Sequence, residues 1–217
     1  MSRNGYIKGI AGQQVATGLY RIGAIKDKNQ SPDGAGFRLK LHETNPNAPL
    51  SPVYIDLRLL QSFPALLSQT ATLYLQLVEQ LSFDLIAGIP VAAVPTATVI
   101  SQLCGKPMIT PRMSEKGHGS GAKVDGVYQA DQTVLLVDDL CTKAGSKLEA
   151  IKVLEEAGLV VKDVVVLVDR EQGGGKELAD AGYTLHAAFT LRELLGFYLE
   201  NGMMSQALYK EIMAYLG

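Results

Sequence analysis

The 217 residues of this chain show two different patterns of hydrophobic positions. In residues 13–25 and 64–81, apolar positions recur every three or four residues, which predicts two helices that each bury one face. Residues 37–41 and 53–57 lie between them and are short and apolar, so we expect two edge strands there. The first third of the chain therefore predicts a helix, two short strands and a second helix.

The pattern changes after residue 83 to short apolar runs separated by helical segments. The runs occupy residues 84–88, 107–110, 133–138 and 164–169. Within the last two, residues 134–137 and 164–168 are continuously apolar, as strands covered on both faces must be. Helical patterns at residues 96–103 and 147–157 lie between the runs, and Gly158 follows the second as its C-cap. Such alternation predicts an α/β fold with a mostly parallel sheet, right-handed crossovers and ligands at the carboxyl ends of its strands.

Composition narrows the class of protein. With 47% hydrophobic and 19% charged residues, the chain suits one compact α/β domain or a domain with a small appended hood. A net charge of -2 offers no general attraction to nucleic acid. Cys104 and Cys141 are far apart and lack metal-ligand spacing, so we interpret both as packing residues of a protein in a reducing compartment.

Export and membrane insertion are not indicated. The first six residues lack the apolar core of a signal peptide. Residues 85–105 carry no charge and are about 20 residues long, the length of a membrane span. Pro90 and Pro95 would break such a helix, whereas a strand, a turn and a helix explain the same run. We therefore expect a cytoplasmic protein.

The segment richest in chemistry follows the apolar run at residues 133–137. Asp138 and Asp139 directly follow this run, and a loop of small residues then leads into the next helix. The amides of residues 142–146, the hydroxyls of Thr142 and Ser146 and the helix dipole would form a cradle for a phosphate. The two carboxylates would accept hydrogen bonds from sugar hydroxyls. Alternatively the acids only cap the helix and the loop is a turn, but the buried strand before them favours a sugar-phosphate site.

An apolar strand, two acids and such a loop resemble the phosphoribosyl-pyrophosphate motif of type I phosphoribosyltransferases. Further stretches resemble, in order, those of orotate phosphoribosyltransferase, especially the orotate domain of eukaryotic-type uridine monophosphate synthase. They are residues 51–58, 112–119, 168–174 and 185–195. No decarboxylase domain is recognised. The resemblance implies the type I phosphoribosyltransferase fold, with residues 1–60 as a small N-terminal helix and hood that contributes to the base pocket and residues 61–217 as the core.

The resemblance also implies a function and its residues. The chain would transfer the phosphoribosyl group of phosphoribosyl pyrophosphate to orotate, giving orotidine monophosphate and pyrophosphate, as a Mg²⁺-dependent homodimer. Phosphoribosyl pyrophosphate would be bound by Asp138, Asp139, Thr142, Lys143, Ala144, Gly145 and Ser146. Orotate would be bound by Lys40, Tyr54, Ile55, Thr142 and Arg170, the last through its carboxylate.

The catalytic groups implied are Arg112, Lys116, His118 and Asp139. The first three lie on a mobile loop, residues 112–121, that would reach into the active site of the partner subunit. Mg²⁺ would be held mainly through phosphoribosyl pyrophosphate, with Asp138 and Asp139 as its candidate protein ligands.

Several residues depart from the family pattern. Met113 stands where a second basic residue is usual, and losing a charged donor to a transition state costs about 2.7–4 kcal/mol. Ala144 replaces a usual Gly, and a left-handed backbone there would add about 1–2 kcal/mol of strain. Ala92 stands where many bacterial relatives carry Lys. Lys143 is either a further cation for the phosphate or a solvated surface residue.

Two other functions stay open from the sequence. One is a paralogous enzyme that uses another base, and the other is a nucleotide-sensing protein of the same fold with weak or no turnover. An assay of orotate consumption distinguishes an orotate enzyme from the paralogous enzyme. Binding of orotidine monophosphate without release of pyrophosphate would indicate the sensing protein.

Overall fold

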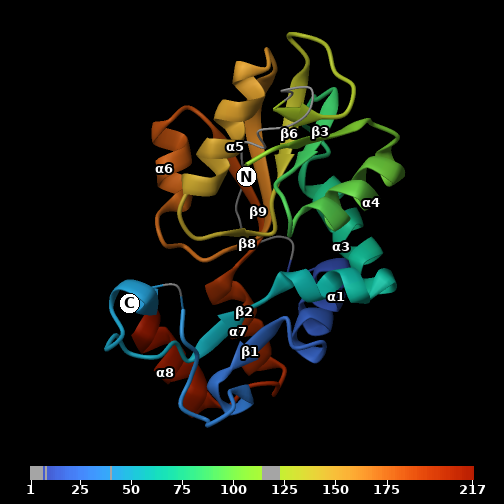
Figure 1. The fold of residues 1–217 in the computed structure, drawn as a ribbon. Coiled ribbons are helices and arrows are strands. Elements are labelled where there is room, and N and C mark those ends of the chain that lie inside the picture. The colour runs from blue at the N-terminus through green and yellow to red at the C-terminus, as the bar shows by residue number, and fades with distance from the viewer. Residues whose placement is uncertain (1–6, 8, 40, 114–122) are drawn as a thin grey trace.

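A mostly parallel sheet of seven strands forms the centre of the larger part of the molecule (Figure 1). The structure is a computed structural model that describes residues 7, 9–39, 41–113 and 123–217, and the strand count refers to these. The strands are β3 (Leu85–Gly88), β4 (Met108–Pro111), β5 (Val124–Asp125), β6 (Thr133–Val137), β7 (Leu140–Cys141), β8 (Val160–Asp169) and β9 (Thr184–Thr190). Neighbours pair in parallel except β4 with β5, so the predicted mostly parallel sheet is confirmed.

The central strand β8 places the two acids of the motif. Its first half pairs with β6, and its last residues, Val168 and Asp169, pair with β7. On its other side β8 pairs with β9. Asp138 and Asp139 therefore lie between β6 and β7, beside the carboxyl end of the longest strand.

Helices cover both faces of this sheet (Figure 1). They are α3 (Pro64–Leu77), α4 (Val94–Cys104), α5 (Gly145–Glu156) and α6 (Gly174–Asp180). Leu135 and Val137 belong to the hydrophobic cluster that includes residues of α3 and α4, whereas Val134 and Leu136 belong to the one that includes residues of α5 and α6. Alternate residues of one strand thus enter opposite cores, which is why residues 134–137 of β6 are all apolar.

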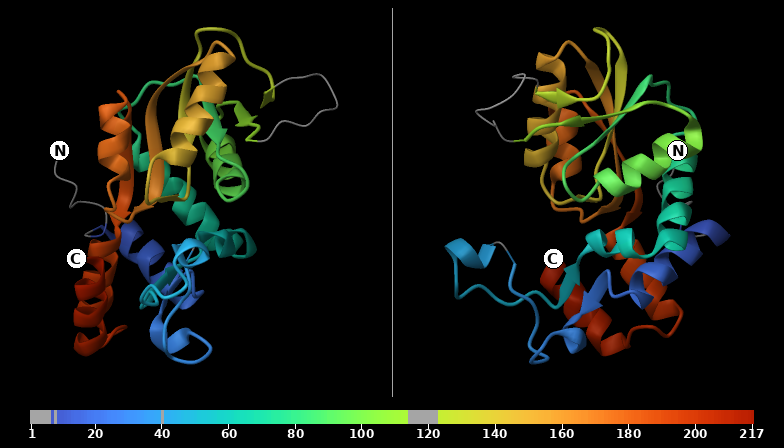
Figure 2. Two further views of the ribbon diagram at one scale, coloured as in Figure 1. Left: turned by 60° about the vertical axis from the view of Figure 1, so that its left-hand side comes forward. Right: turned by 45° about the vertical axis from the view of Figure 1, so that its right-hand side comes forward.

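A smaller part of the molecule is formed by both ends of the chain (Figure 2). Its N-terminal elements are α1 (Ile10–Arg21), β1 (Ile25–Asp27), η1 (Lys28–Gln30), α2 (Leu41–Thr44), β2 (Val53–Ile55) and η2 (Leu57–Ser62), and its C-terminal ones are α7 (Leu191–Glu200) and α8 (Gln206–Leu216). The Tyr198 hydroxyl donates to the Ala16 carbonyl at 3.0 Å, and the Tyr20 hydroxyl donates to the Met203 carbonyl at 2.6 Å. The C-terminal helices thus complete the hood, and its boundary at residue 60 stays a prediction.

The strand predicted at residues 37–41 is wrong. Among the described residues of this segment only Phe37 makes a bridge, to Ser51, and α2 begins at residue 41. The ring of His42 instead hydrogen-bonds the backbone of Leu39 and the carbonyl of Ala48. These side-chain bonds satisfy the backbone locally and replace a strand ladder.

The helix predicted for residues 13–25 ends earlier, at Arg21. Gly23 adopts a left-handed backbone with φ 71°, which stops the helix. Ile25, predicted as the last apolar position of that helix, lies in β1 and is buried there.

The uncharged run at residues 85–105 forms β3, a turn and α4, as predicted. Within the described part of the chain, none of the helices is both long and apolar enough to cross a membrane.

Candidate functional site

The two acids after β6 differ in their surroundings. Asp138 is buried, its Oδ1 accepts the Asp139 amide at 2.9 Å, and its Oδ2 lies 2.6 Å from Lys147 Nζ. Tyr74, also buried, donates its hydroxyl to the Asp138 carbonyl at 2.8 Å. Asp138 is therefore anchored at its backbone and at both carboxylate oxygens.

Asp139 is only half-buried and lies beside this anchored carboxylate. Burial, and then the negative charge of Asp138, raise the pKa of Asp139 to about 7, while Lys147 acts in the opposite direction. Its carbonyl accepts the amides of Leu167 and Val168 at 3.1 and 3.2 Å. The backbone of Asp139 is thus fixed against β8, and its carboxyl changes charge near neutral pH.

The 142–146 loop leads directly into α5. The first amides of a helix have no intrahelical partners, so those of Gly145 and Ser146, both exposed, can bind an anion. Ala144 has φ -82° and ψ -8°, an ordinary right-handed backbone, so the strain expected for alanine there does not arise. Alanine in place of the usual glycine at residue 144 therefore does not distort the loop that would bind the phosphate.

Glu177 of α6 binds the backbone of this loop, a role that the sequence did not predict. Its Oε2 accepts the Ala144 amide at 2.8 Å, and its Oε1 lies 3.3 Å from Lys143 Nζ. The amide hydrogen bond and Lys143 lower the pKa of Glu177. Lys143, predicted as a phosphate ligand or a solvated lysine, is exposed and paired with Glu177, and its contact with phosphate stays a prediction.

The loop and α6 also touch through a glycine. A methyl group on Gly174 would lie 2.5 Å from Cys141 Sγ and 3.1 Å from the Thr142 carbonyl oxygen. Such distances leave no room for a side chain, so Gly174 allows the 142–146 loop and the residues after β8 to pack together.

Arg170 follows β8 and is tied to the same region, because its amide donates to the Cys141 carbonyl at 2.8 Å. Its side chain is partly buried, and burial lowers the pKa of Arg170. Its Nε is buried without a hydrogen-bond partner in the described part of the chain, and no described carboxylate forms a salt bridge with it. A buried N–H without a partner is costly, and a guanidinium binds a carboxylate well, which makes Arg170 a candidate ligand for a carboxylate.

Tyr54 and Ile55 lie on β2, where Tyr54 stacks on Phe37 with ring centroids 5.3 Å apart. Ile55 pairs with Ile25 of β1. This aromatic pair is half-buried and forms a flat apolar surface that suits a planar base.

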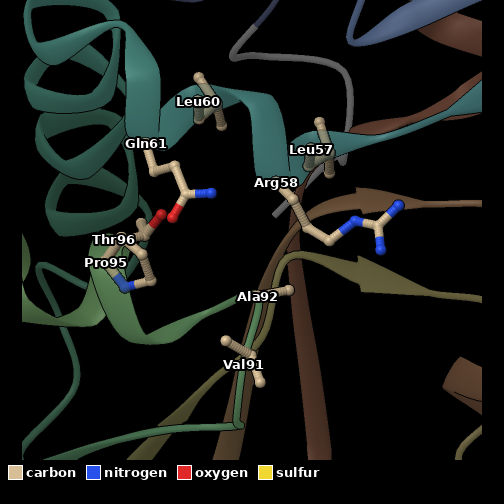
Figure 3. A pocket seen from close by; sticks show the side chains of 8 residues that line it. All are labelled: Leu57, Arg58, Leu60, Gln61, Val91, Ala92, Pro95 and Thr96. Atoms are coloured by element: carbon tan, nitrogen blue, oxygen red, sulfur yellow. The ribbon is translucent and has the colours of Figure 1, made fainter.

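Arg58, in η2, is a second residue for which the sequence predicted no role. It lines a cavity of about 60 Å³ together with Leu57, Leu60, Gln61, Val91, Ala92, Pro95 and Thr96 (Figure 3). Its hydrogen bond to Asp56, at 2.6 Å, is the main cause that raises the pKa of Arg58, and the charges of Tyr54 and Asp139 contribute. Arg58 therefore brings a positive charge to a cavity beside the turn that joins β3 to α4.

The predicted mobile loop is described only at its ends. Arg112 forms a bidentate ion pair with Asp125 across the β4–β5 hairpin, and Met113 packs partly against the cluster beneath α5. Lys116 and His118 lie outside the described residues, as does Lys40.

The structure thus brings together one group of the predicted residues at the carboxyl edge of β6, β7 and β8. This group comprises Asp138, Asp139, Thr142, Lys143, Ala144, Gly145, Ser146 and Arg170. Arg112 lies apart, in the hairpin at the β5 edge of the sheet. Among the described residues, no three His, Cys, Asp or Glu side chains gather as a metal site would require.

Comparison with known proteins places the chain in context. A family model described as "Phosphoribosyl transferase domain" matches residues 59–188. Uridine 5'-monophosphate synthase of Bos taurus is 37% identical over 83% of this chain and 35% of that protein. Orotate phosphoribosyltransferase of Caenorhabditis elegans is 32% identical over 77% of this chain and 74% of that protein.

The solved structure of Leishmania donovani UMP synthase superposes with a TM-score of 0.82 and 33% identity, covering 97% of this chain and 43% of that one. The chain thus spans about a third of the bovine synthase but most of the nematode protein.

Proposed function

Because the chain belongs to the orotate phosphoribosyltransferase family, we propose that it transfers the phosphoribosyl group of phosphoribosyl pyrophosphate to orotate, releasing pyrophosphate. The names of the relatives support this function, which the sequence also predicted, and do not favour another base or a sensor. The observation that carries the proposal is Arg170, whose backbone amide binds the Cys141 carbonyl just before the loop assigned to the phosphate, and whose buried Nε has no hydrogen-bond partner among the described residues.

The described residues divide the two substrates between them. The amides at the start of α5, with the hydroxyls of Thr142 and Ser146, would bind the 5-phosphate. Asp139 would accept hydrogen bonds from the ribose hydroxyls. Arg170 would bind the orotate carboxylate through two parallel hydrogen bonds, while Tyr54 lines the base.

The reaction develops opposite charges on the ribose and on the leaving pyrophosphate. As the bond to pyrophosphate breaks, positive charge develops on the ribose carbon and negative charge on the leaving group. The ionised Asp139 would lie near the first, and Arg58 near the second, in the cavity beside Val91 and Ala92. Arg58 would then supply a cation beside Ala92, where many bacterial relatives carry Lys.

Mg²⁺ would fit this site beside the acid pair. Asp138 is buried and already bound by Lys147 and by an amide, so Asp139 is the more accessible carboxylate of the two. Mg²⁺ commonly binds through one or two carboxylates together with substrate phosphates. Bound mainly to the pyrophosphate group, it would neutralise the charge of the leaving group.

We also propose that the chain works as a cytoplasmic homodimer in which residues 112–121 contribute to the partner's site. This proposal is supported by the resemblance of residues 112–119 to the loop that, in orotate phosphoribosyltransferases, reaches into the active site of the partner subunit. Sedimentation of the purified chain tests the dimer, and a monomer at the concentration used for assay would contradict it.

The function is tested by following orotate consumption spectrophotometrically, with phosphoribosyl pyrophosphate and with or without Mg²⁺. We expect turnover that requires both, and we expect Arg170→Met to raise the KM for orotate far more than that for phosphoribosyl pyrophosphate. Turnover with uracil or a purine but not with orotate would contradict the assigned base. Tight binding of orotidine monophosphate without pyrophosphate release would contradict catalysis.

A further inference from the structure

Glu177, in the first turn of α6, is a negative group bound to the loop that the phosphate would use. Its Oε2 accepts the Ala144 amide at 2.8 Å, and its Oε1 lies 3.3 Å from Lys143 Nζ. The Ala144 amide is the main cause that lowers the pKa of Glu177, and Lys143 adds to it, so this carboxylate is ionised at neutral pH. Its two oxygens bind an amide and an ammonium, as two oxygens of a phosphate would.

The turn before α6 keeps Lys143 beside Glu177. Gly173 adopts a left-handed backbone with φ 98°, and a methyl group on it would lie 3.1 Å from Lys143 Nζ. The Gly174 amide donates to the Thr142 carbonyl at 3.2 Å, which connects the start of α6 to the loop. The pairing of Lys143 with Glu177 therefore follows from the way these two segments pack.

This contact is nevertheless open to solvent. The side chains of Lys143 and Glu177 are 65% and 42% exposed, and the next residues of the loop, Gly145 and Ser146, are exposed as well. An exposed ion pair is weak, because water solvates both partners and salt screens them. A dissolved phosphate can therefore reach the Ala144 amide and the Lys143 ammonium and replace the carboxylate.

We propose that Glu177 is an affinity-determining residue whose carboxylate competes with the 5-phosphate of the substrate for the Ala144 amide and for Lys143. The inference deepens the proposed function and rests on it, because it takes the 142–146 loop as the phosphate site. Any substrate or product that carries the 5-phosphate then has to displace one internal hydrogen bond and one ion pair. Glu177 thus weakens the binding of the substrate and favours release of the nucleotide product.

Glu177→Gln tests this competition, because it removes the charge and keeps a side chain of the same size. Calorimetric titration with ribose 5-phosphate in low salt should show binding about threefold tighter than in the unmodified chain, the scale of an exposed ion pair. If Glu177 only stabilised the loop, the same change would leave the affinity equal or weaken it. Asp180→Asn is the matched control: it removes a negative charge from the same helix, where Asp180 pairs with Lys176, and should leave the affinity unchanged.

Salt and kinetics separate competition from a structural role of Glu177. The gain in affinity of Glu177→Gln should disappear at about 1 M salt, where charges more than about 3 Å apart are screened. In the enzymatic assay at low salt, the KM for phosphoribosyl pyrophosphate should fall about threefold and the KM for orotate should not change. A gain that persists undiminished in high salt, or an equal fall of both KM values, would overturn the proposal.

The titration with ribose 5-phosphate also separates this inference from the proposed function. If the unmodified chain binds ribose 5-phosphate and Glu177→Gln binds it no more tightly, the competition is wrong and the function stands. If neither of them binds it at millimolar concentration, the proposed function fails, and the competition fails with it.

Discussion

Replacing Gly174 by alanine should disturb the active site through packing alone. Gly174 begins α6, and a methyl group there would lie 2.5 Å from Cys141 Sγ and 3.1 Å from both the Thr142 oxygen and the Lys143 carbonyl carbon. Two of these three atoms belong to the backbone of the loop assigned to the 5-phosphate, so relief of the contact requires that loop to move.

The expected change in the free energy of unfolding of Gly174→Ala follows from two opposing effects. Overpacking of a closed contact costs about 1–3 kcal/mol. Alanine also favours a helix over glycine by up to about 1 kcal/mol, although less at the first position. The free energy of unfolding of Gly174→Ala should therefore fall by about 1–2 kcal/mol.

The neighbouring Gly175 provides a matched control. A methyl group there would meet only Leu185 Cδ2 at 3.4 Å and an Asp169 oxygen at 3.9 Å, which are ordinary contacts. Urea denaturation should show Gly175→Ala unchanged or more stable by up to about 1 kcal/mol, with its KM for phosphoribosyl pyrophosphate unchanged. Gly174→Ala should be less stable and have a KM raised severalfold. If the two variants were equal in stability and in KM, the close packing of the loop on α6 would not be what places the phosphate.

Three further outcomes are expected. Arg170→Met should abolish orotate binding without lowering the melting temperature, because it removes a buried group without a partner; a large loss of stability would contradict this. Since the pKa of Asp139 is raised to about 7 in the folded chain, the folded state binds more protons than the unfolded state between about pH 4 and pH 7. The contribution of this carboxyl to the free energy of unfolding therefore falls as pH rises from about 4 to 7, and Asp139→Asn should remove that part of the slope in urea titrations at several pH values. Burial raises the pKa of Cys141 to about 11, so iodoacetamide at neutral pH should modify the half-buried Cys104 first, as peptide mass spectrometry would show.

The sheet was predictable because its strands leave a strong signal. Residues 134–137 and 164–168 are apolar at every position, and both lie in strands that are buried on both faces. The resemblance to the phosphoribosyltransferase family and the fold class are likewise confirmed. The acids and the small-residue loop follow directly from the end of β6, so local sequence was enough to find them.

The contacts that position the site were not predictable in the same way. Lys147 and Glu177 are charged residues in helices, and the simplest expectation for each is an exposed face; only the tertiary structure brings them to Asp138 and Ala144. The strand expected at residues 37–41 failed because the side chain of His42 competes for the backbone, an effect that apolar patterning does not register.

Calorimetric binding of orotidine monophosphate, compared with uridine monophosphate, tests the central claim most directly. The two nucleotides share the ribose and the 5-phosphate and differ only in the base carboxylate, the group assigned to Arg170. We predict that the unmodified chain binds orotidine monophosphate at least tenfold more tightly than uridine monophosphate, and that Arg170→Met removes this preference. Equal affinity of the unmodified chain for both nucleotides, or no binding of either at millimolar concentration, would contradict the account.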